Sequence, residues 1–570
     1  MTFESLIHGG GAVALAAATL LVACGPGAGP QPEAPPAGPP QRTLVMVSYG
    51  EPPHFVMKHG SASGEGSGSG ARQPFVGNLS ERDDRGMARP VLAESLPQLG
   101  TDTWRVLPDG RMETIYRLRG GLKWHDGTSF TADDIVFSWR VYVHPEAGVG
   151  PAPQNLLEEV AAIDERTVLF RWRQPTVRAG ALSGGTSGFT PLPRHVLSDS
   201  FEHGDLKAFL GLSYWTRDYV GLGAYRLEQW EPGAFMQGTA FDGFALGRPR
   251  IERIRVIFSG NRDAVLATLL AGGAVATVAD AIGSAQAAVL EREWGNGGAG
   301  IVIASTTDVR YVQIQFKPEV VNPRVLLDPR ARKAIAHAID RQALADGVIE
   351  GKGRVAEAYV APEHPHYAEI DRAITKYPYD PRRTEQLLAE VGVIKQADGS
   401  YRTGAGEPFH LQMLGEIEKE LVILADSFRR AGISAGISHL TPVLSRDREL
   451  QTVYPALSVR ANHFELVGFF GTFSTGRIAS EQTRWTGSNR GGYSNPEYDR
   501  LYDAQEASLD EGERARLDAS LARLISDDVP GIPVYYQLQF DGHLAALRGP
   551  TPYPSDTDRT WNLHEWEWVR

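Results

Sequence analysis

Strand-like and helix-like stretches alternate along most of this chain. Residues 309–316 and 529–540 have the apolar pattern of strands, while residues 330–344, 382–392 and 497–505 have helical spacing. Each of these helical stretches follows an Asp-Pro or Asn-Pro pair, in which the first residue caps the helix and proline occupies its first turn. Such alternation predicts an α/β protein. At 570 residues, more than one domain is expected.

The stretch LRGGLKWHDGTSFTADDIVFSW, residues 118–139, collects side chains that also occur in catalytic and metal sites. Each has a structural explanation. Asp126 is expected to form a turn next to the lone His125. Thr131 is predicted to cap a helix, with Asp134 reaching back to it as in a capping box. Because metal ligands would have to converge from one helix face or from separate elements, we expect this stretch to be structural.

The N-terminus has the features of an export signal. Residues 11–24 form an apolar run that is too short to span a bilayer and that ends at Cys24, the single cysteine of the chain. The sequence Leu-Val-Ala-Cys before and at this position resembles a bacterial lipobox, in which the cysteine is lipidated and becomes the mature N-terminus. The first ten residues carry no Lys or Arg, although signal peptides begin with basic residues. The alternative is an unmodified cysteine buried in an N-terminal helix.

Composition and motifs exclude several classes of function. A formal net charge of −12 argues against a nucleic-acid-binding protein. The sequence has no nucleophile elbow G-x-S-x-G, no zinc motif H-E-x-x-H and no phosphate-binding loop. In EHPHY, residues 363–367, a proline between two histidines prevents helical ligand spacing, so we interpret it as a surface loop rather than a metal site. We expect no cofactor, no metal and no enzymatic activity.

A set of longer motifs resembles the family 5 extracellular solute-binding proteins, the peptide, nickel and oligosaccharide receptors of ABC importers. The similarity begins with YRLRGGLKWHDGTSFTADDIVFSW and continues, in the family's order, through GLGAYRLEQWEPG, ARKAIAHAIDRQAL, YDPRRTEQLLAEVG, GGYSNPEYDRLYDA and VPGIPVYY. These motifs cover nearly the whole chain from residue 42 to residue 570.

The resemblance implies an α/β fold with two lobes, of the large type II periplasmic-binding-protein class, with a third subdomain inserted in the first lobe and a hinge between the lobes. It implies the following division: signal peptide 1–23; Pro/Gly-rich tether 24–41; first lobe 42–84, 206–300 and 527–570; inserted subdomain 85–205; second lobe 301–526.

The resemblance also implies a function without chemistry. Such a receptor is a monomer, held by a lipid on Cys24 at the periplasmic or cell-surface side of a membrane, that binds a small solute between its lobes and delivers it to an ABC permease. The expected cargo is an oligopeptide. The alternatives are a receptor for an oligosaccharide or a metal chelate, a peptide-binding sensor or chaperone, and a hydrolase with a pair of carboxylates on the same scaffold.

One departure from the family weakens the peptide assignment. Peptide-binding relatives carry an aspartate in the second lobe that pairs with the amino terminus of the ligand, but the corresponding residues 457–473 contain no aspartate. Glu465 is a candidate substitute, and Arg460 is a candidate partner for a carboxylate instead. Either is equally interpreted as a solvated surface charge.

The remaining candidate ligand contacts follow from position in the chain. They are Tyr49 and Glu51 after the first strand, Tyr214 and Trp215 before a glycine-rich turn, and Asn489, Arg490 and Tyr493 in the second lobe. The alternative for each is an ordinary core or surface residue.

Overall fold

One large mixed sheet runs through the protein. The computed structural model describes residues 43–56, 69–144, 154–182, 189–278, 280–295, 297–441, 443–463, 469–553 and 559–569. The order of the sheet is β17 (Ser434–His439), β16 (His410–Gly415), β18 (Leu457–His463), β12 (Gly300–Ile314), β19 (Gly531–Leu544), β11 (Ala276–Val278), β1 (Leu44–Ser48), β10 (Arg253–Phe258), β9 (Phe235–Ala240) and β8 (Tyr225–Glu231), and β13 (Arg354–Val355) pairs with β19. The predicted signal peptide, the tether and Cys24 lie outside the described residues.

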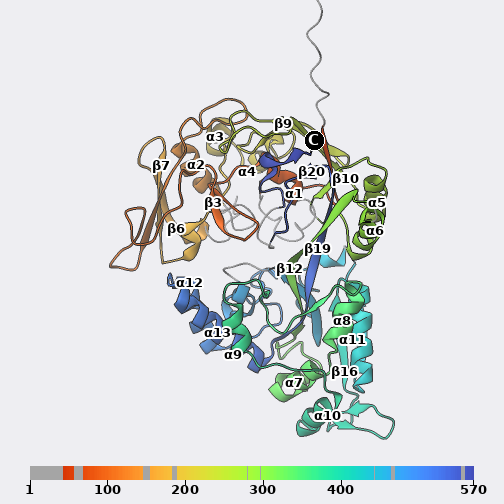
Figure 1. The fold of residues 1–570 in the computed structure, drawn as a ribbon. Coiled ribbons are helices and arrows are strands. Elements are labelled where there is room, and N and C mark those ends of the chain that lie inside the picture. The colour runs from red at the N-terminus through yellow and green to blue at the C-terminus, as the bar shows by residue number, and fades with distance from the viewer. Residues whose placement is uncertain are drawn as a thin grey trace, which may run out of the picture. The chain divides into compact units, whose positions relative to one another are not determined.

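Two long antiparallel strands, β12 and β19, connect two groups of elements that form the lobes (Figure 1). Their pairing extends from Gly300 opposite Leu544 to Gln313 opposite Gly531. At one end β19 pairs with β11 of the first lobe, and at the other end β12 pairs with β18 of the second lobe. A register shift between Thr306 and Asp308 falls between these two regions.

A separate antiparallel sheet forms within residues 85–205. Its order is β4 (Trp104–Val106), β5 (Met112–Arg117), β7 (Thr167–Trp172) and β6 (Leu157–Ala162). Three strand pairs complete the sheets: β2 (Ser80–Arg82) with β3 (Ala88–Pro90), β14 (Ile394–Lys395) with β15 (Tyr401–Arg402), and β20 (Leu547–Arg548) with β21 (Glu567–Trp568).

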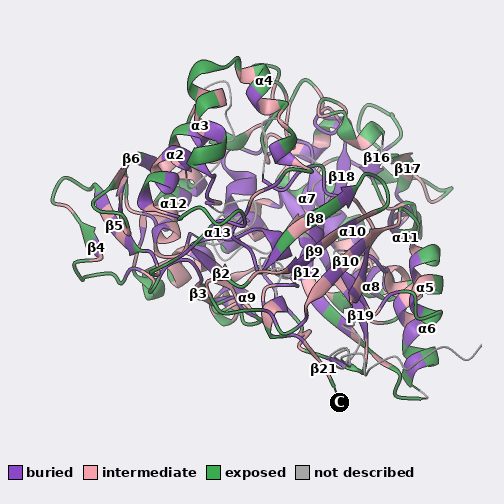
Figure 2. Cartoon of the chain, turned by 90° about the horizontal axis from the view of Figure 1, so that it is seen from above, coloured by how far each residue is buried: buried purple, intermediate pink, exposed green. Residues whose placement is uncertain are grey.

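The helices lie on both sides of β12 in the chain. Those before it are α1 (Ser69–Arg72), α2 (Ala132–Tyr142), α3 (Arg194–His203), α4 (Leu206–Leu210), α5 (Arg262–Leu270) and α6 (Ser284–Gly295). Those after it are α7 (Pro329–His337), α8 (Arg341–Val348), α9 (Tyr367–Ala373), α10 (Pro381–Glu390), α11 (Glu418–Arg430), α12 (Pro496–Ala507) and α13 (Glu511–Asp528). Figure 2 shows largely buried central strands and exposed outer faces on peripheral helices such as α3 and α4.

Local capping determines where the helices begin. The side chains of Asp328, Asp380 and Asn495 accept hydrogen bonds from backbone N–H groups of the helix that each precedes, as predicted. The prediction of one helix over 330–344 was wrong. The chain leaves the helix after His337 and starts a new one at Arg341, because Asp340 caps α8 and its own N–H donates to Ser427 Oγ on α11.

The predicted structural roles in residues 118–139 are confirmed. The carboxylate of Asp134 accepts a hydrogen bond from the N–H of Thr131 at 3.0 Å, which completes the capping of α2. His125 is buried, its Nδ1 accepts from the N–H of Gly221 at 3.2 Å, and its Nε2 donates to the carbonyl of Gly223 at 3.0 Å. Burial lowers the pKa of His125 to about 4, so the ring is neutral and joins two segments of the first lobe.

Candidate functional site

The best candidate for a ligand site lies at strand ends of the second lobe. β16 and β18 run parallel, with Leu414 opposite Ser458, so Arg460 lies beside the carboxyl end of β16. On its other side, Arg460 is opposite Tyr311 of the connecting strand β12. Open α/β sheets bind their ligands at the carboxyl ends of strands. Arg460 is half-buried at this edge, close to the point where β12 and β19 pass to the first lobe.

A second arginine, Arg490, is positioned by a rigid turn. The buried side chain of Asn489 donates to the carbonyls of Ser474 and Tyr493, at 3.0 and 2.7 Å, and accepts from the N–H groups of Gly492 and Tyr493. These four hydrogen bonds use the full capacity of the amide. The predicted site residue Asn489 therefore holds the loop that carries Arg490, which stays a candidate ligand contact.

Glycine at position 491 brings this loop against β12. A Cβ at Gly491 would lie 2.6 Å from the carbonyl oxygen of Ile314, 3.0 Å from the Tyr454 hydroxyl and 3.2 Å from Cγ of Gln313. Such separations are shorter than van der Waals contact. The absence of a side chain thus places Arg490 next to Tyr454 and Gln313.

The two arginines form a cationic pair without a counter-ion in the part of the chain that the structure describes. Burial and, to a smaller extent, the positive charge of Arg460 together lower the pKa of Arg490 to about 9. Both guanidinium groups also act electrostatically on the hydroxyl of Tyr454. Neither arginine side chain forms a hydrogen bond or an ion pair with a described residue. The carboxylate that acts electrostatically on Arg490 is that of exposed Glu416, which follows β16.

Two neutral polar groups at the same place are also unpaired within the described residues. The hydroxyl of Tyr454 and Oε1 of Gln313 are buried without a hydrogen-bond partner, and their side chains are 2% and 1% exposed. Neither residue was predicted from the sequence. They come from distant parts of the chain, and nothing in either local sequence marks them.

The predicted residues of the first lobe have other partners. Glu51 accepts hydrogen bonds from Trp230 Nε1 at 2.6 Å and from the N–H of Gly233 at 2.8 Å. The ring of Tyr49 lies under the guanidinium of Arg262, 4.8 Å from its centre. These contacts hold both side chains in place.

The aromatic candidates are packed into cores. Tyr214 and Trp215 are 3% and 4% exposed and belong to the aromatic core of the first lobe, where Trp215 Nε1 donates to the carbonyl of Phe209 at 2.8 Å. Tyr493 is buried in the second lobe and donates to the carboxylate of Asp528 at 2.6 Å. Glu465 lies outside the described residues.

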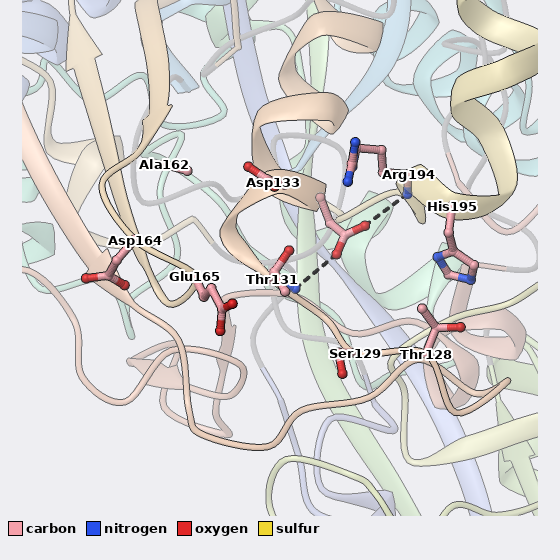
Figure 3. Close-up of a pocket in the computed structure, with 10 residues that line it drawn as sticks. Thr128, Ser129, Thr131, Asp133, Ala162, Asp164, Glu165, Arg194 and His195 are labelled. Atoms are coloured by element: carbon pink, nitrogen blue, oxygen red, sulfur yellow. Dashed lines mark hydrogen bonds between the residues drawn. The ribbon is translucent and has the colours of Figure 1, made fainter.

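An acidic hollow in the inserted subdomain serves as a contrast (Figure 3). Its volume is about 420 Å³, and its lining is Thr128, Ser129, Thr131, Asp133, Asp134, Ala162, Asp164, Glu165, Arg194 and His195. The carboxylate of Asp134 is already bound by the N–H groups of Thr131 and Arg194, at 3.0 and 2.9 Å. His195 is bound to Asp126 at 2.7 Å. The side chains of Asp134 and His195 therefore already have partners within the protein.

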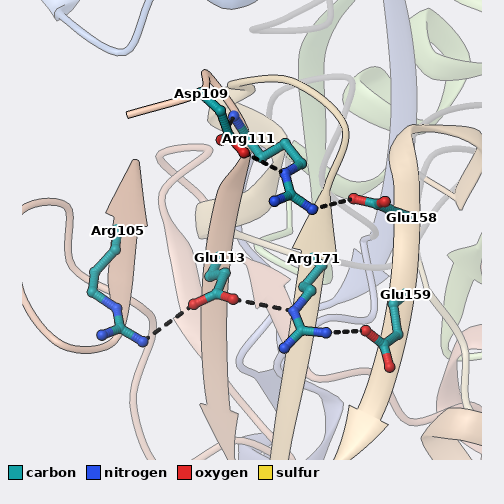
Figure 4. A network of polar contacts seen from close by, with 7 residues as sticks. All are labelled: Arg105, Asp109, Arg111, Glu113, Glu158, Glu159 and Arg171. Atoms are coloured by element: carbon teal, nitrogen blue, oxygen red, sulfur yellow. Dashed lines mark hydrogen bonds and ion pairs between the residues drawn. The ribbon is translucent and has the colours of Figure 1, made fainter. Parts of the chain in front are cut away.

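On the exposed face of the inserted sheet, arginine side chains pair with carboxylates (Figure 4). Arg105 and Arg171 both bind Glu113, at 3.2 and 3.1 Å, and Arg111 binds Asp109 at 2.8 Å. Exposed pairs of this kind are screened by solvent and contribute little to stability. They differ from the arginine pair of the second lobe, which is more deeply placed and has no described partner.

The described residues include no group of three or more His, Cys, Asp or Glu side chains that suits a metal ion. In the EHPHY loop, Nδ1 of His366 lies 2.7 Å from the carboxylate of Asp518 on α13. Among the described helices, none combines the length and the apolar character needed to span a bilayer.

Comparisons with known proteins agree with this architecture. The chain is 21% identical over 548 residues to the oligopeptide-binding protein AppA of Bacillus subtilis, covering 93% of this chain and 92% of that protein. The structure of AppA in complex with a nonapeptide matches with a TM-score of 0.70, 20% identity and coverage of 93% and 99%. NikZ from Campylobacter jejuni in complex with Ni(L-His) matches with a TM-score of 0.74, 19% identity and coverage of 93% and 100%. The predicted two-lobed α/β fold is confirmed.

A family model provides the assignment. The model of the bacterial extracellular solute-binding proteins, family 5 (middle), matches residues 90–461, which is more than half of the chain. The chain therefore belongs to the family 5 bacterial extracellular solute-binding proteins.

Proposed function

We propose that this protein is the solute receptor of an ABC importer, which binds oligopeptide-like solutes between its lobes and delivers them to a membrane permease. Family membership and the similarity to AppA, a protein named for oligopeptide binding, over 93% of the chain support this function. The structural observation that carries it is the polar site of Arg460 and Arg490, near the strands that connect the two lobes.

The proposed binding cycle follows from the two connecting strands. A cargo that contacts both lobes favours the closed form only if it binds that form more tightly than the open one. β12 and β19 act as the hinge, within the predicted division into a first lobe (42–84, 206–300 and 527–570), an insertion (85–205) and a second lobe (301–526). In this proposal Tyr49 and Glu51 contact the cargo from the first lobe. Arg460, Arg490 and Glu465 contact it from the second lobe.

The membrane attachment is proposed from the sequence. Lipidation of Cys24 after removal of residues 1–23 would tether a monomeric receptor to the outer face of a membrane. Metabolic labelling with radioactive palmitate, followed by membrane fractionation, tests this directly. Label in the wild-type chain and none in Cys24→Ser is the expected result, whereas an unlabelled wild-type chain contradicts the anchor.

Cargo class and the absence of catalysis require one combined experiment. Native mass spectrometry of the freshly purified protein identifies a co-purified ligand, and uptake of the same compound is then measured in cells with and without the gene. We expect an intact oligopeptide and a loss of uptake. Cleaved peptide would indicate a hydrolase, and unchanged uptake with normal binding would indicate a sensor or chaperone. An oligosaccharide or a metal chelate would correct the cargo class alone.

A further inference from the structure

Contacts between the lobes occur on two sides of the connecting strands. In Figures 1 and 2, α6 and α8 lie on one side of β12 and β19, whereas α12 and the inserted sheet lie on the other side. The core cluster of the first side contains Leu290 of α6, Leu344 of α8 and Phe540 of β19. A rotation of the lobes about the connecting strands therefore moves the two sides in opposite senses.

An ion pair joins the lobes on the side of α6 and α8. Lys352, which follows α8, pairs with both carboxylate oxygens of Glu291 on α6. In the predicted division of the chain, Lys352 belongs to the second lobe and Glu291 to the first. The ammonium group lies 5.4 Å from the ring centre of Phe540 on β19. This back-side pair, Lys352 and Glu291, thus lies directly beside a connecting strand.

The turn that carries Lys352 is tightly folded against α8. Glu350 has a φ of +50°, a left-handed conformation that is uncommon for residues other than glycine. At Gly353, a Cβ would lie 2.1 Å from the carbonyl oxygen of Ala345, so only glycine allows this approach. The N–H of Lys352 donates to the carbonyl of Ile349 at 2.9 Å. Lys352 therefore reaches α6 from a fixed backbone position.

The charged contact on the other side of the connecting strands is longer. Arg178 of the inserted subdomain lies 3.8 Å from the carboxylate of Glu506 on α12. A charge-assisted hydrogen bond is about 2.7–2.9 Å long, so this distance can shorten when the lobes approach each other. The back-side pair is already in direct contact. Further closing shortens the contact at α12 and pulls the back-side pair apart.

We propose that the back-side pair opposes closing of the lobes and thereby lowers the affinity for cargo. This inference rests on the proposed receptor function and adds a pair of residues, outside the ligand site, that regulates it. Because cargo binds the closed form, its apparent dissociation constant is the intrinsic constant divided by the fraction of closed molecules. An interaction that favours the open form lowers this fraction, so its loss tightens binding.

Substitutions of Glu291 test the sign of this effect. Glu291→Gln removes the attraction to Lys352, and Glu291→Lys replaces it with repulsion. The two side chains are 31% and 44% exposed, so solvent screens the pair and a modest effect is expected. Calorimetric titration of the full chain with a library of tripeptides that have free carboxyl termini should give dissociation constants about threefold lower in Glu291→Gln and about fivefold or more lower in Glu291→Lys.

The double exchange Glu291→Lys/Lys352→Glu restores an ion pair with reversed polarity. It should return the dissociation constant to within about twofold of the wild-type value, because the attraction between opposite charges does not depend on which lobe carries which sign. Such a rescue separates the charge interaction from any other effect of the lysine at position 291.

A measurement without ligand tests the conformational part directly. Cys24 is the single cysteine of the chain, so cysteines introduced in a Cys24→Ser background are labelled specifically. Asp199→Cys on α3 and Glu511→Cys on α13 place spin labels at exposed positions of different lobes. Pulsed electron paramagnetic resonance should show a larger population at short distance in Glu291→Lys than in the wild type. A purely structural pair would lower the melting temperature and leave this distance unchanged.

Matched controls come from ion pairs that lie within one lobe. Lys395 pairs with Glu385 at 2.8 Å, with side chains 41% and 48% exposed, and its ammonium group lies 5.9 Å from the ring centre of Tyr401. Glu385→Gln therefore removes the same kind of contact as Glu291→Gln. Glu293→Gln, beside the back-side pair on α6, is the second control. Both should keep the wild-type dissociation constant and the wild-type distance between the labels.

The possible results have separate meanings. Tighter binding and a shorter distance in Glu291→Lys, both reversed by the double exchange, support the inference. Unchanged or weaker binding of the peptides that the wild type binds, or an unchanged distance, overturns it. If the wild type binds no tripeptide, the proposed cargo is wrong, and the ligand-free distance alone then decides the inference by the same criterion.

Discussion

A contact between the lobes allows the closing motion to be tested without changing the ligand site. Arg178, in the short helix η3 (Val177–Gly180) of the inserted subdomain, lies 3.8 Å from the carboxylate of Glu506 on α12 of the second lobe. The two side chains are only 12% and 16% exposed. Leu509, just after α12, packs against the core of the first lobe.

The substitution Glu506→Gln removes the charge of this contact. At 3.8 Å and an effective dielectric constant of 20, the Coulomb attraction is about 4 kcal/mol, most of which is offset by desolvation. A net contribution of about 1 kcal/mol is therefore expected. Because the contact joins the inserted subdomain to the second lobe, we expect it to favour the closed form, and its loss should then raise the dissociation constant of the cargo about fivefold.

The assay is calorimetric titration of wild-type and variant chains with a library of tripeptides that have free carboxyl termini. Glu497→Gln on the same helix is the control, because Glu497 pairs with Arg500 of its own helix, at 2.7 Å. An unchanged dissociation constant in Glu506→Gln, or an equal loss in the control, would refute the assignment of this contact to the closed form.

Three further predictions concern stability. Folding lowers the pKa of His125 to about 4, whereas an unfolded histidine titrates near 6.5, so the free energy of unfolding should be highest above pH 6.5 and fall by about 3 kcal/mol as the pH drops through 4. Urea unfolding at several pH values should show that this free energy depends less on pH in His125→Gln than in the wild type. Glu420→Gln leaves Arg310 buried without its counter-ion and should cost about 3–5 kcal/mol in urea unfolding, and Arg310→Met/Glu420→Leu should recover most of this loss. Asn489→Ala removes four hydrogen bonds and should lower stability by about 2–4 kcal/mol and weaken cargo binding, as calorimetry would show. A free energy of unfolding that does not change with pH would contradict the role given to His125. An unchanged free energy of unfolding in Glu420→Gln, or wild-type cargo affinity in Asn489→Ala, would contradict the roles given to those residues.

Features that depend on neighbouring residues were predictable from the sequence. The starts of α7, α10 and α12 follow from Asp-Pro and Asn-Pro pairs, because the cap and the proline act within one turn. The capping of α2 by Thr131 and Asp134 is local for the same reason. These elements agree with the sequence because no distant contact overrides them.

Features that depend on tertiary contacts were not predictable. The apolar pattern continues through Asp340, so the break between α7 and α8 becomes visible only with the hydrogen bond to Ser427. Tyr214 and Trp215 have the composition of cleft residues, but the same aromatic side chains serve equally well in a core. Tyr454 and Gln313 join the site through the close approach of Gly491, which no local pattern encodes.

The central claim is that this protein binds a solute and releases it unchanged. The most direct measurement is thermal unfolding of the full chain with and without a library of tripeptides that have free carboxyl termini, followed by mass spectrometry of the recovered peptides. Ligand at about one hundred times its dissociation constant should stabilise the fold by about 2.7 kcal/mol, and the peptides should be recovered intact. An unfolding transition that no peptide shifts, or peptides recovered in cleaved form, would contradict the account.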